Sequence, residues 1–474
     1  MLRTIITLMI AFICTGVQAQ LVEQVGPVPS LKQMKWQEME FYLFMHFGPN
    51  TFSDMEWGTG REDAKIFNPT ELDCRQWARI ARDAGARGII ITAKHHDGFC
   101  LWPNQYSNYT VSESPWKNGH GDVLKELSDA CSSYGIKFGV YISPWDRNHP
   151  DYGTEDYNTI YVKSMTQLLH NYDEVFEIWW DGANGEGPNG KKQQYDFPRF
   201  ERTARMLAPG AVIFSDIGPD IRWVGNEKGI AGTTNWSLLD TAGFSRGIGA
   251  PPVDTLNTGN INGKAWIPAE CDVSIRPGWF YHPGEDALVK TGKDLMKFYM
   301  TSIGRGANLL LNVPPDRRGL IPAADSASLM AFRDLREACF QTNLAFRCKV
   351  NVSSSRAGYL PSLLTDGFRF SHWAPLKDST TCWIELDMQS HKQFNTILLQ
   401  EYIEGGQRIE EFKADAWNDT DSSWVPISQG TTVGYKRILQ FPRQMTSKVR
   451  VSITKSKASP ILGEIQIYDC PDYQ

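Results

Sequence analysis

The chain has 474 residues, of which 41% are hydrophobic and 22% are charged, and its formal net charge is −6 at pH 7. This length is too great for one ordinary core and predicts two domains of a soluble, globular protein. The charge is mildly acidic and no basic stripe interleaved with aromatic residues occurs, which argues against nucleic acid as a partner.

The first nineteen residues have the pattern of a cleavable export signal. Arg3 precedes an apolar run over residues 5–14, and Val17 and Ala19 supply the small residues needed for cleavage before Gln20. The run is too short for a membrane span, and no later segment is long and apolar enough to form one. We therefore expect residues 1–19 to be a signal peptide and the mature protein to be periplasmic or secreted.

Eight cysteines remain after residue 19, and none of them forms a CxxC pair or has histidines at zinc-binding spacing. In a chain of this size they need not form a disulfide framework. We expect most of them to be buried thiols. If any two form a disulfide, Cys339 and Cys348 are the favoured pair.

Segments with strand and helix character alternate from about residue 40 to residue 315. One helix should begin after Asp122 and end at Gly135, and another should begin after Thr70 and end at Gly85. Repeated βα units predict an α/β fold, either a (β/α)8-like barrel or an open doubly wound sheet. No GxGxxG motif follows the first strand, which favours the barrel. The expected strands are residues 42–46, 88–93, 136–143, 175–180, 211–216 and 307–313.

Polar residues follow the ends of successive predicted strands. In chain order these residues are His46, His95, His96, Tyr141, Asp181 and Glu227. A barrel brings the carboxyl ends of its strands to one face, so we expect these side chains to form one site. For Asp181 the alternative is a helix N-cap, because Asp followed by Gly often begins a turn.

Two acids among histidines and tryptophans suit glycoside hydrolysis, in which one carboxylate attacks the sugar and a second carboxyl group acts as the acid. Asp181 would be the nucleophile, and neutral histidines would donate hydrogen bonds to ring hydroxyls. The alternative is a zinc site made of His46, His95 and His96. We disfavour it because adjacent residues of a strand point to opposite faces, so His95 and His96 should not share a metal.

Six short strings carry a resemblance to a known family. They are Met45-His-Phe-Gly, Glu56-Trp-Gly, Ala93-Lys-His-His-Asp-Gly-Phe, Gly139-Val-Tyr-Ile-Ser, Trp179-Trp-Asp-Gly and Leu309-Leu-Leu-Asn-Val-Pro-Pro. With them the chain resembles the α-L-fucosidases of glycoside hydrolase family 29 over residues 30–345. The resemblance implies a (β/α)8-like barrel, retaining removal of a terminal α-L-fucose, and no metal or organic cofactor.

The resemblance also implies roles for individual residues. Asp181 matches the nucleophile and Glu227 the general acid/base, with Glu270 as the second choice for the acid/base. Residues 222–227 and 274–283 resemble the subgroup that prefers branched α-1,3/1,4-fucosyl linkages. The residues that match substrate-binding positions are Phe44, His46, Glu56, Trp57, His95, His96, Tyr141 and Trp179, of which Phe44 and Trp179 line the pocket for the C6 methyl group.

We expect the catalytic domain to cover residues 20–348, with a closing helix over residues 326–346, and a second domain to cover residues 349–474. In that domain short alternating segments are separated by Gly, Asn, Asp and Pro, which predicts an all-β jelly-roll sandwich. It resembles the galactose-binding-like, discoidin-type modules. Three roles stay open: glycan binding, a structural calcium ion, and packing against the barrel, which we favour.

The sequence thus predicts a secreted, retaining exo-α-L-fucosidase that acts on fucosylated oligosaccharides. One alternative is a catalytically silent, fucose-binding relative of lectin type. Another is a hydrolase of a related sugar such as α-L-galactose. The presence of both Asp181 and Glu227 favours the enzyme, and no oligomeric state follows from the sequence.

Overall fold

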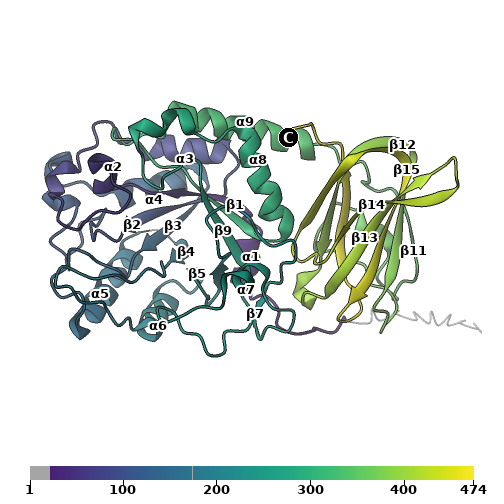
Figure 1. Cartoon of the computed structure of the whole chain (residues 1–474), viewed down its shortest axis with the longest axis horizontal. Helices are drawn as coiled ribbons and strands as arrows, with labels where there is room; N and C mark the ends of the chain where they lie inside the picture. Colours follow the sequence, from purple (N-terminus) through teal and green to yellow (C-terminus); the bar gives the residue numbers. More distant parts are fainter. Residues whose placement is uncertain (1–21, 173, 474) are drawn as a thin grey trace, which may run out of the picture.

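A computed structural model describes residues 22–172 and 174–473, which form a barrel and a sandwich side by side (Figure 1). Eight parallel strands close the barrel in the order β1-β10-β9-β6-β5-β4-β3-β2. The predicted (β/α)8-like barrel is therefore confirmed, and the open sheet is excluded. The barrel strands are β1 Phe41–Met45, β2 Gly88–Lys94, β3 Lys137–Ile142, β4 Val175–Trp179, β5 Val212–Ser215, β6 Ile221–Trp223, β9 Ala269–Ser274 and β10 Asn308–Asn312.

Helices surround the barrel, and α4 has the ends that the sequence predicts. The Asp122 carboxylate accepts a hydrogen bond from Lys125 N at 2.9 Å, and Gly135 ends the helix with a φ of 68°. The helices are α1 Leu31–Gln37, α2 Pro49–Ser53, α3 Cys74–Asp83, α4 Val123–Tyr134, α5 Glu155–Asn171, α6 Phe197–Leu207, α7 Val253–Thr258, α8 Gly292–Thr301 and α9 Ala323–Phe340. A two-stranded ribbon of β7 Leu238–Leu239 and β8 Ala265–Trp266 lies outside the barrel sheet.

Two helix boundaries differ from the prediction. The cap of α3 is Asp73 and not Thr70, because the Asp73 carboxylate accepts hydrogen bonds from the amides of Arg75 at 2.9 Å and Gln76 at 3.0 Å. The closing helix α9 ends at Phe340, earlier than expected. Beyond it, Asn343 Oδ1 accepts hydrogen bonds from Ala345 N at 3.0 Å and from Ile467 N at 3.1 Å, which turns the chain toward the sandwich.

The C-terminal domain is the predicted antiparallel sandwich. Its strands pair in the order β11-β12-β15-β13-β14, with β16 also paired to β12. In the long strand β12, register shifts between Asp387 and Lys392 and between Phe394 and Thr396 break the ladder and let the strand bend. The strands are β11 Lys349–Val352, β12 Cys382–Glu401, β13 Ile409–Asn418, β14 Ser423–Gly430, β15 Arg437–Ser456 and β16 Leu462–Tyr468.

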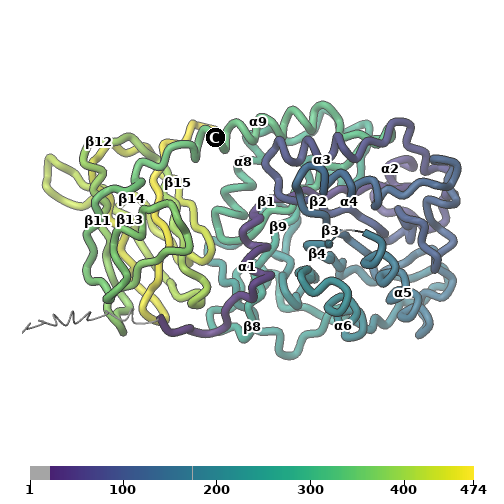
Figure 2. Tube along the Cα trace, turned by 180° about the vertical axis from the view of Figure 1, so that it is seen from behind, coloured from purple at the N-terminus to yellow at the C-terminus, as the bar shows by residue number. Residues whose placement is uncertain are grey.

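The sandwich packs against the barrel. The segment before α1 passes the base of the sandwich on its way to the barrel (Figure 2), and Val25 N donates a hydrogen bond to Gly405 O at 3.0 Å. The Gln407 side chain of the sandwich both accepts and donates hydrogen bonds to the barrel. Its Oε1 accepts from Ser237 N at 2.7 Å, and its Nε2 donates to Asn235 O at 2.9 Å. These contacts join the two domains through backbone groups.

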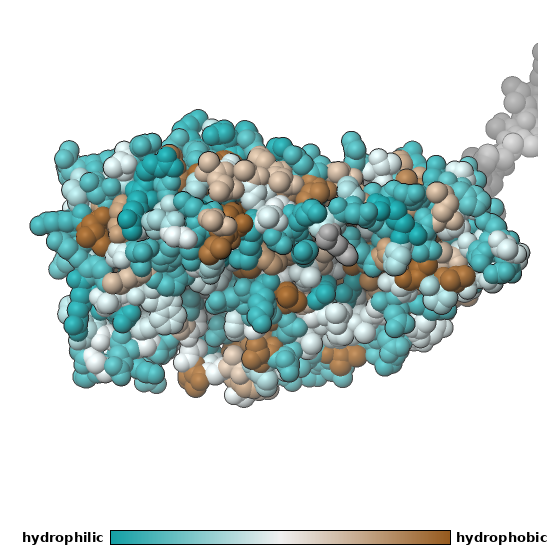
Figure 3. Space-filling model, turned by 45° about the horizontal axis from the view of Figure 1, so that its top comes forward, coloured by the Kyte–Doolittle hydropathy of each residue, from teal (hydrophilic) through white to brown (hydrophobic). Residues whose placement is uncertain are grey.

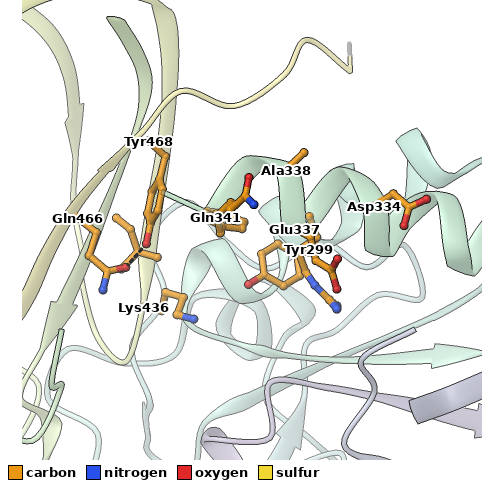
Figure 4. A pocket seen from close by; sticks show the side chains of 11 residues that line it. Tyr299, Asp334, Glu337, Ala338, Gln341, Lys436, Gln466 and Tyr468 are labelled. Atoms are coloured by element: carbon orange, nitrogen blue, oxygen red, sulfur yellow. Dashed lines mark hydrogen bonds between the residues drawn. The ribbon is translucent and has the colours of Figure 1, made fainter. Parts of the chain in front are cut away.

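A groove of about 750 Å³ runs along this junction, between helices α8 and α9 and the sandwich (Figure 4). Tyr299 and Gln341 come from the barrel side, and Lys436 and Tyr468 come from the sandwich side. Lys436 forms an ion pair with Glu40, which crosses the junction. Lys436, one of two cations that line the groove together with Arg336, is therefore already paired within the protein.

Hydrophobic side chains on the face shown in Figure 3 occur in small groups among hydrophilic ones. Within residues 22–172 and 174–473, no helix combines the length and the apolarity that a membrane span requires. The expected signal peptide lies outside the described residues.

Cys339 is bonded to Cys470, so the expected pairing of Cys339 with Cys348 is wrong. The end of α9 lies beside the last strand of the sandwich, where Phe340 and Tyr468 make an edge-to-face contact at 5.1 Å. Cys348, in contrast, packs at the edge of the sandwich core. The true partner lies 131 residues away in sequence, so only the tertiary fold brings the two sulfur atoms together.

This disulfide predicts a stability effect. Because it closes a loop with a sequence separation of 131 residues around the whole sandwich, its loss should lower the free energy of unfolding by about 2–5 kcal/mol. We expect Cys470→Ala to lower the sandwich melting temperature under non-reducing conditions, and a reductant to lower it similarly in the unaltered chain. Cys348→Ala is the matched control and should shift it far less. Equal shifts in the two variants would contradict the prediction.

Candidate active site

A pocket of about 230 Å³ opens among the segments that follow the barrel strands. It is smaller than the roughly 300–1,000 Å³ of pockets for larger organic ligands, and its size suits one sugar ring. The structure brings all ten residues predicted from the sequence into its lining, together with three that were not predicted. The lining residues are Phe44, His46, Glu56, Trp57, His95, His96, Tyr141, Trp179, Asp181, Ala183, Glu227, Asp272 and Trp279.

Asp181 lies just beyond the end of β4 and is surrounded by donors. Its Oδ1 accepts a hydrogen bond from Ala183 N at 2.7 Å, and its Oδ2 accepts one from the Tyr141 hydroxyl at 3.2 Å. These two contacts fix the orientation of the carboxylate. The next helix, α6, is capped by Asp196, so Asp181 is not a helix cap. The N-cap alternative is therefore wrong, and the carboxylate is free to face the pocket.

A second carboxyl group, that of Asp216, interacts electrostatically with Asp181. A Cβ atom at position 182 would come within 2.1 Å of Asp216 Oδ2, so a larger residue there would force the Asp216 side chain to shift. Burial and the nearby Asp181 charge raise the pKa of Asp216 to about 6. Asp216 therefore takes up a proton more readily than an ordinary aspartate, which limits the negative charge beside Asp181.

Hydrogen bonds define the tautomer of His46. Asn312 Nδ2 donates to Ser274 Oγ at 2.9 Å and to Trp279 O at 2.7 Å, so the Asn312 atom that meets His46 Nδ1 at 2.9 Å is the amide oxygen. Nδ1 then carries the proton, and Nε2 is an acceptor. Burial lowers the pKa of His46 to about 3, so the ring is neutral at pH 7.

The same argument defines the tautomer of His96. Ser143 Oγ donates its proton to Trp145 O at 3.0 Å and lies 2.8 Å from His96 Nδ1, so Nδ1 is the donor of that pair. Nε2 is then an acceptor, 3.7 Å from Asp181 Oδ2. Burial lowers the pKa of His96, against the influence of Asp181. The Nε2 atoms of His46 and His96 are therefore hydrogen-bond acceptors, whereas the sequence analysis expected donors.

His95 and His96 both line the pocket, which contradicts the expectation that they point to opposite faces. Strand β2 ends at Lys94, so the two histidines lie in the following loop, where strand alternation no longer applies. Their ring centroids are 4.2 Å apart. Among the described residues, no group of three His, Cys, Asp or Glu side chains has the arrangement of a metal site.

Aromatic rings form one wall of the pocket. Trp179 stacks on Phe214 with centroids 4.1 Å apart and on Tyr141 at 5.2 Å, and Phe44 lies 5.4 Å from Trp179. The Trp179 indole N–H donates to Glu270 Oε1 at 2.8 Å. Glu270 is fully buried beneath this wall and does not line the pocket, so its position supports a structural role.

Glu227 lies in the loop after β6 and is exposed at the pocket. The Trp279 indole N–H donates to Glu227 Oε2 at 3.3 Å. Partial burial raises the pKa of Glu227, the Trp279 hydrogen bond opposes this, and the charges of Asp181 and Glu56 raise it further. Asp181 thus accepts two hydrogen bonds, whereas Glu227 accepts one longer hydrogen bond and has a pKa raised by partial burial and by nearby acids.

Asp272 and Trp279 line the pocket although the sequence analysis did not single them out. Asp272 is buried and accepts a hydrogen bond from Trp223 Nε1 at 2.9 Å. Burial, followed by the nearby Glu227 and Glu270, raises its pKa well above the usual range. Period-two alternation in β9 places Glu270 and Asp272 on the same, inward face. That alternation could have identified Asp272 from the sequence.

Comparison with known proteins agrees with this site. Residues 32–334 match the family model described as alpha-L-fucosidase, and residues 349–464 match the F5/8 type C domain. Alpha-L-fucosidase 1 of Arabidopsis thaliana is 42% identical over 448 residues, which cover 93% of this chain and 87% of that protein. The crystal structure of SpGH29 superposes with a TM-score of 0.91 at 39% identity, covering 95% of this chain and all of that one (100%).

A Ruminococcus gnavus fucosidase of glycoside hydrolase family 29, solved in complex with fucose, superposes with a TM-score of 0.88 at 30% identity. The alignment covers 96% of this chain and 97% of that chain. The family match spans the whole barrel, including every strand end that contributes to the pocket. The chain is therefore an enzyme of the α-L-fucosidase family, glycoside hydrolase family 29.

Proposed function

We propose that this enzyme is a retaining exo-α-L-fucosidase that releases terminal α-L-fucose from fucosylated glycans. The observation that carries the proposal is the joint placement of Asp181 and Glu227 in one pocket of about 230 Å³, with hydrogen-bond donors at the first carboxyl group and neighbouring acids at the second. Retaining glycosidases need one ionised and one protonated carboxyl group in this way. A pocket for one sugar ring suits cleavage of a terminal residue.

In the proposed first step, Asp181 attacks the anomeric carbon while Glu227 gives its proton to the departing glycosidic oxygen. The glycosidic bond breaks, and a covalent fucosyl ester forms on Asp181. In the second step, Glu227 takes a proton from a water molecule, whose oxygen attacks the same carbon and displaces Asp181. Fucose leaves with its original anomeric configuration, and both carboxyl groups return to their starting states.

The other lining residues orient the sugar in this proposal. The acceptor nitrogens of His46 and His96 receive hydrogen bonds from ring hydroxyls, and Phe44 and Trp179 surround the C6 methyl group. An apolar slot for that methyl favours fucose over α-L-galactose, which carries a hydroxyl group there. Binding energy at these positions holds the anomeric carbon against Asp181.

For the linkage we propose α-1,3- and α-1,4-linked fucose. The proposal rests on the resemblance of residues 222–227 and 274–283 to the branched-linkage subgroup, and it is supported by their meeting at the pocket through Trp279 and Glu227. A sugar attached next to the fucose would contact this junction and could help to place the acid/base.

We also propose that the enzyme is exported to the periplasm or secreted. The support is the signal-like pattern of residues 1–19 and the bond between Cys339 and Cys470, since disulfides persist mainly in oxidising compartments. Its substrate would then be an extracellular or periplasmic fucosylated oligosaccharide.

The nucleophile can be tested directly. Asp181→Asn should lower kcat by about 10³-fold or more, because the covalent ester cannot form, while fucose should still bind to the unchanged pocket. A 2-fluoro fucosyl reagent should label Asp181, as identified by peptide mass spectrometry. Labelling of Asp216 or Asp272 instead would overturn the assignment.

The acid/base can be tested with two leaving groups. Glu227→Ala should lower hydrolysis of natural oligosaccharides by about 100-fold or more, because a sugar alcohol must be protonated as it departs. Formation of the intermediate from a nitrophenyl fucoside should fall far less, and azide should restore turnover and give a fucosyl azide of retained configuration. Glu270→Gln is the comparison variant. Equal loss on both substrates without azide rescue would assign the role to another residue.

Linkage preference can be measured with matched oligosaccharides. We expect kcat/KM for Lewis-type trisaccharides, which carry α-1,3- or α-1,4-linked fucose, to exceed that for α-1,2-linked fucosyl-lactose by about 10-fold or more, because the neighbouring sugar contributes binding energy in the transition state. Equal values for the two linkages would contradict the proposed specificity and leave the catalytic assignment intact.

A further inference from the structure

We propose that His282 is a positioning residue. As a cation it holds the loop of Trp279, residues 275–282, against the loop of Glu56, residues 54–63. This contact in turn holds Glu227 in place at the pocket. This inference rests on the proposed role of Glu227 as acid/base. It goes further because it assigns a role to a histidine that does not line the pocket.

The contacts of His282 require a charged ring. Its Nδ1 lies 2.8 Å from Asp54 Oδ1, and its Nε2 lies 2.9 Å from Glu56 Oε2. Ionised carboxylates only accept hydrogen bonds, so each ring nitrogen must carry a proton. A neutral imidazole has one N–H and could satisfy only one of these carboxylates. The geometry therefore fits the imidazolium form, in which two charge-assisted hydrogen bonds form at once.

Glu56 transmits this contact to the neighbouring loop. Its Oε1 accepts a hydrogen bond from Trp279 N, and its Oε2 accepts a longer one from Phe280 N at 3.4 Å. A Cβ atom at Gly278 would come within 2.9 Å of Glu56 Oε2 and of His282 Cδ2, so the loop approaches both side chains closely. His282 and the loop amides thus share the Glu56 carboxylate, which fixes the loop against the barrel.

The loop fixed in this way forms part of the pocket. The Trp279 ring lies 5.1 Å from the His46 ring and 6.3 Å from Phe44, and its N–H donates to Glu227 at 3.3 Å. Phe280 packs edge-on against His95 at 5.0 Å. If the loop moves, Glu227 loses this hydrogen bond and two histidines lose their packing partners.

The two ends of the loop are held by different kinds of charge. Near its start, Arg276 makes a bidentate pair with Asp325 at 2.9 Å and 2.6 Å, and both side chains are fully buried. The arginine keeps its charge at all ordinary pH values. At the other end, His282 is the only cation in the contact with Asp54 and Glu56 that the described residues show. This end of the loop can therefore titrate.

The groups that face His282 are acidic. Asp54 and Glu56 come from the loop after α2, and Glu285 comes from the short 3-10 helix Pro283–Leu288. Partial burial lowers the pKa of His282, but the hydrogen bonds to Glu56 and Asp54 and the charges of Glu56 and Glu285 outweigh it, so the net shift is upward. A raised pKa means that the contact is complete at lower pH and is lost as the pH rises through that value.

The test is the pH dependence of kcat/KM on a nitrophenyl fucoside. This leaving group departs without general acid, so ionisation of Glu227 does not limit formation of the intermediate. In the unaltered enzyme we expect an alkaline decline that comes from His282, because the loop that it holds also packs Trp279 against His46 and Phe280 against His95 in the pocket. His282→Gln should remove that decline and lower kcat/KM by about 10-fold on the acidic side. His282→Arg, which stays charged, should shift the decline to higher pH and recover part of the activity.

A second readout separates positioning from general destabilisation. On a natural oligosaccharide, His282→Gln should lose more kcat/KM than on the nitrophenyl fucoside, because only the natural leaving group needs Glu227 in place. Equal losses on the two substrates, with an unchanged pH profile, would overturn the inference. Melting temperatures of the variants show whether each is folded under the assay conditions.

The matched control is His391, an exposed histidine of the sandwich whose Nε2 lies 2.7 Å from Asp419 Oδ2. His391→Gln removes a similar ion pair far along the chain from the pocket and should leave the profile unchanged. If His282→Gln also keeps the unaltered profile, the inference is wrong and the proposed function stands. If the unaltered enzyme releases no fucose from either substrate, the proposed function itself fails.

Discussion

The buried acid pair at the centre of the barrel supports the structure of the pocket above it. Glu177 of β4 and Glu270 of β9 are fully buried, and burial raises the pKa of both, that of Glu270 to about 7. Protonated Glu177 can then donate a hydrogen bond to Glu270, which also accepts from Tyr42 and Trp179, while Trp36 donates to Glu177 at 2.9 Å. Glu177 Oε1 has no other partner among the described residues, so the proton shared with Glu270 is what satisfies the pair in the core. Its donors are therefore fixed, and one of them, Trp179, is the wall of the pocket.

The pocket concentrates acids. Its lining includes Asp181, Glu227, Asp272 and Glu56, and no lysine or arginine of the described residues joins them. The histidines of the lining do not offset this charge because burial lowers their pKa values. Burial first, and then the charges of neighbouring acids, raise the pKa values of Glu227 and Asp272. Glu227 can therefore hold a proton in the same pocket that is lined by Asp181, as the proposed mechanism requires.

The barrel and six residues of the pocket could be predicted from strand periodicity, whereas Phe44, Glu56, Trp57 and Trp179 were assigned through the resemblance to the family. Strand ends in a parallel barrel share one face, so the residue after each strand could be assigned to a common site without knowledge of any distance. Features set by tertiary contacts were not accessible. The partner of Cys339 depends on where the last strand of the sandwich ends. The tautomer of His46 depends on Asn312 of β10, which is far from His46 in sequence but lies beside β1 in the barrel. Asp272 was missed for another reason, since its alternation with Glu270 was present but was not applied.

The two proposed catalytic carboxyl groups differ in what positions them. Asp181 lies just beyond β4, and β4 is held in the barrel by pairing with β3 on one side and β5 on the other. Glu227 lies in an exposed loop beyond β6 and is held by the Trp279 indole from a different loop. That second loop depends in turn on Glu56 from a third. The position of Glu227, the proposed acid/base, therefore depends on three loops, and these loops can vary without changing the barrel. In the proposed mechanism the leaving group lies beside Glu227, so changes in these loops should alter substrate preference and acid placement together, while Asp181 keeps its geometry.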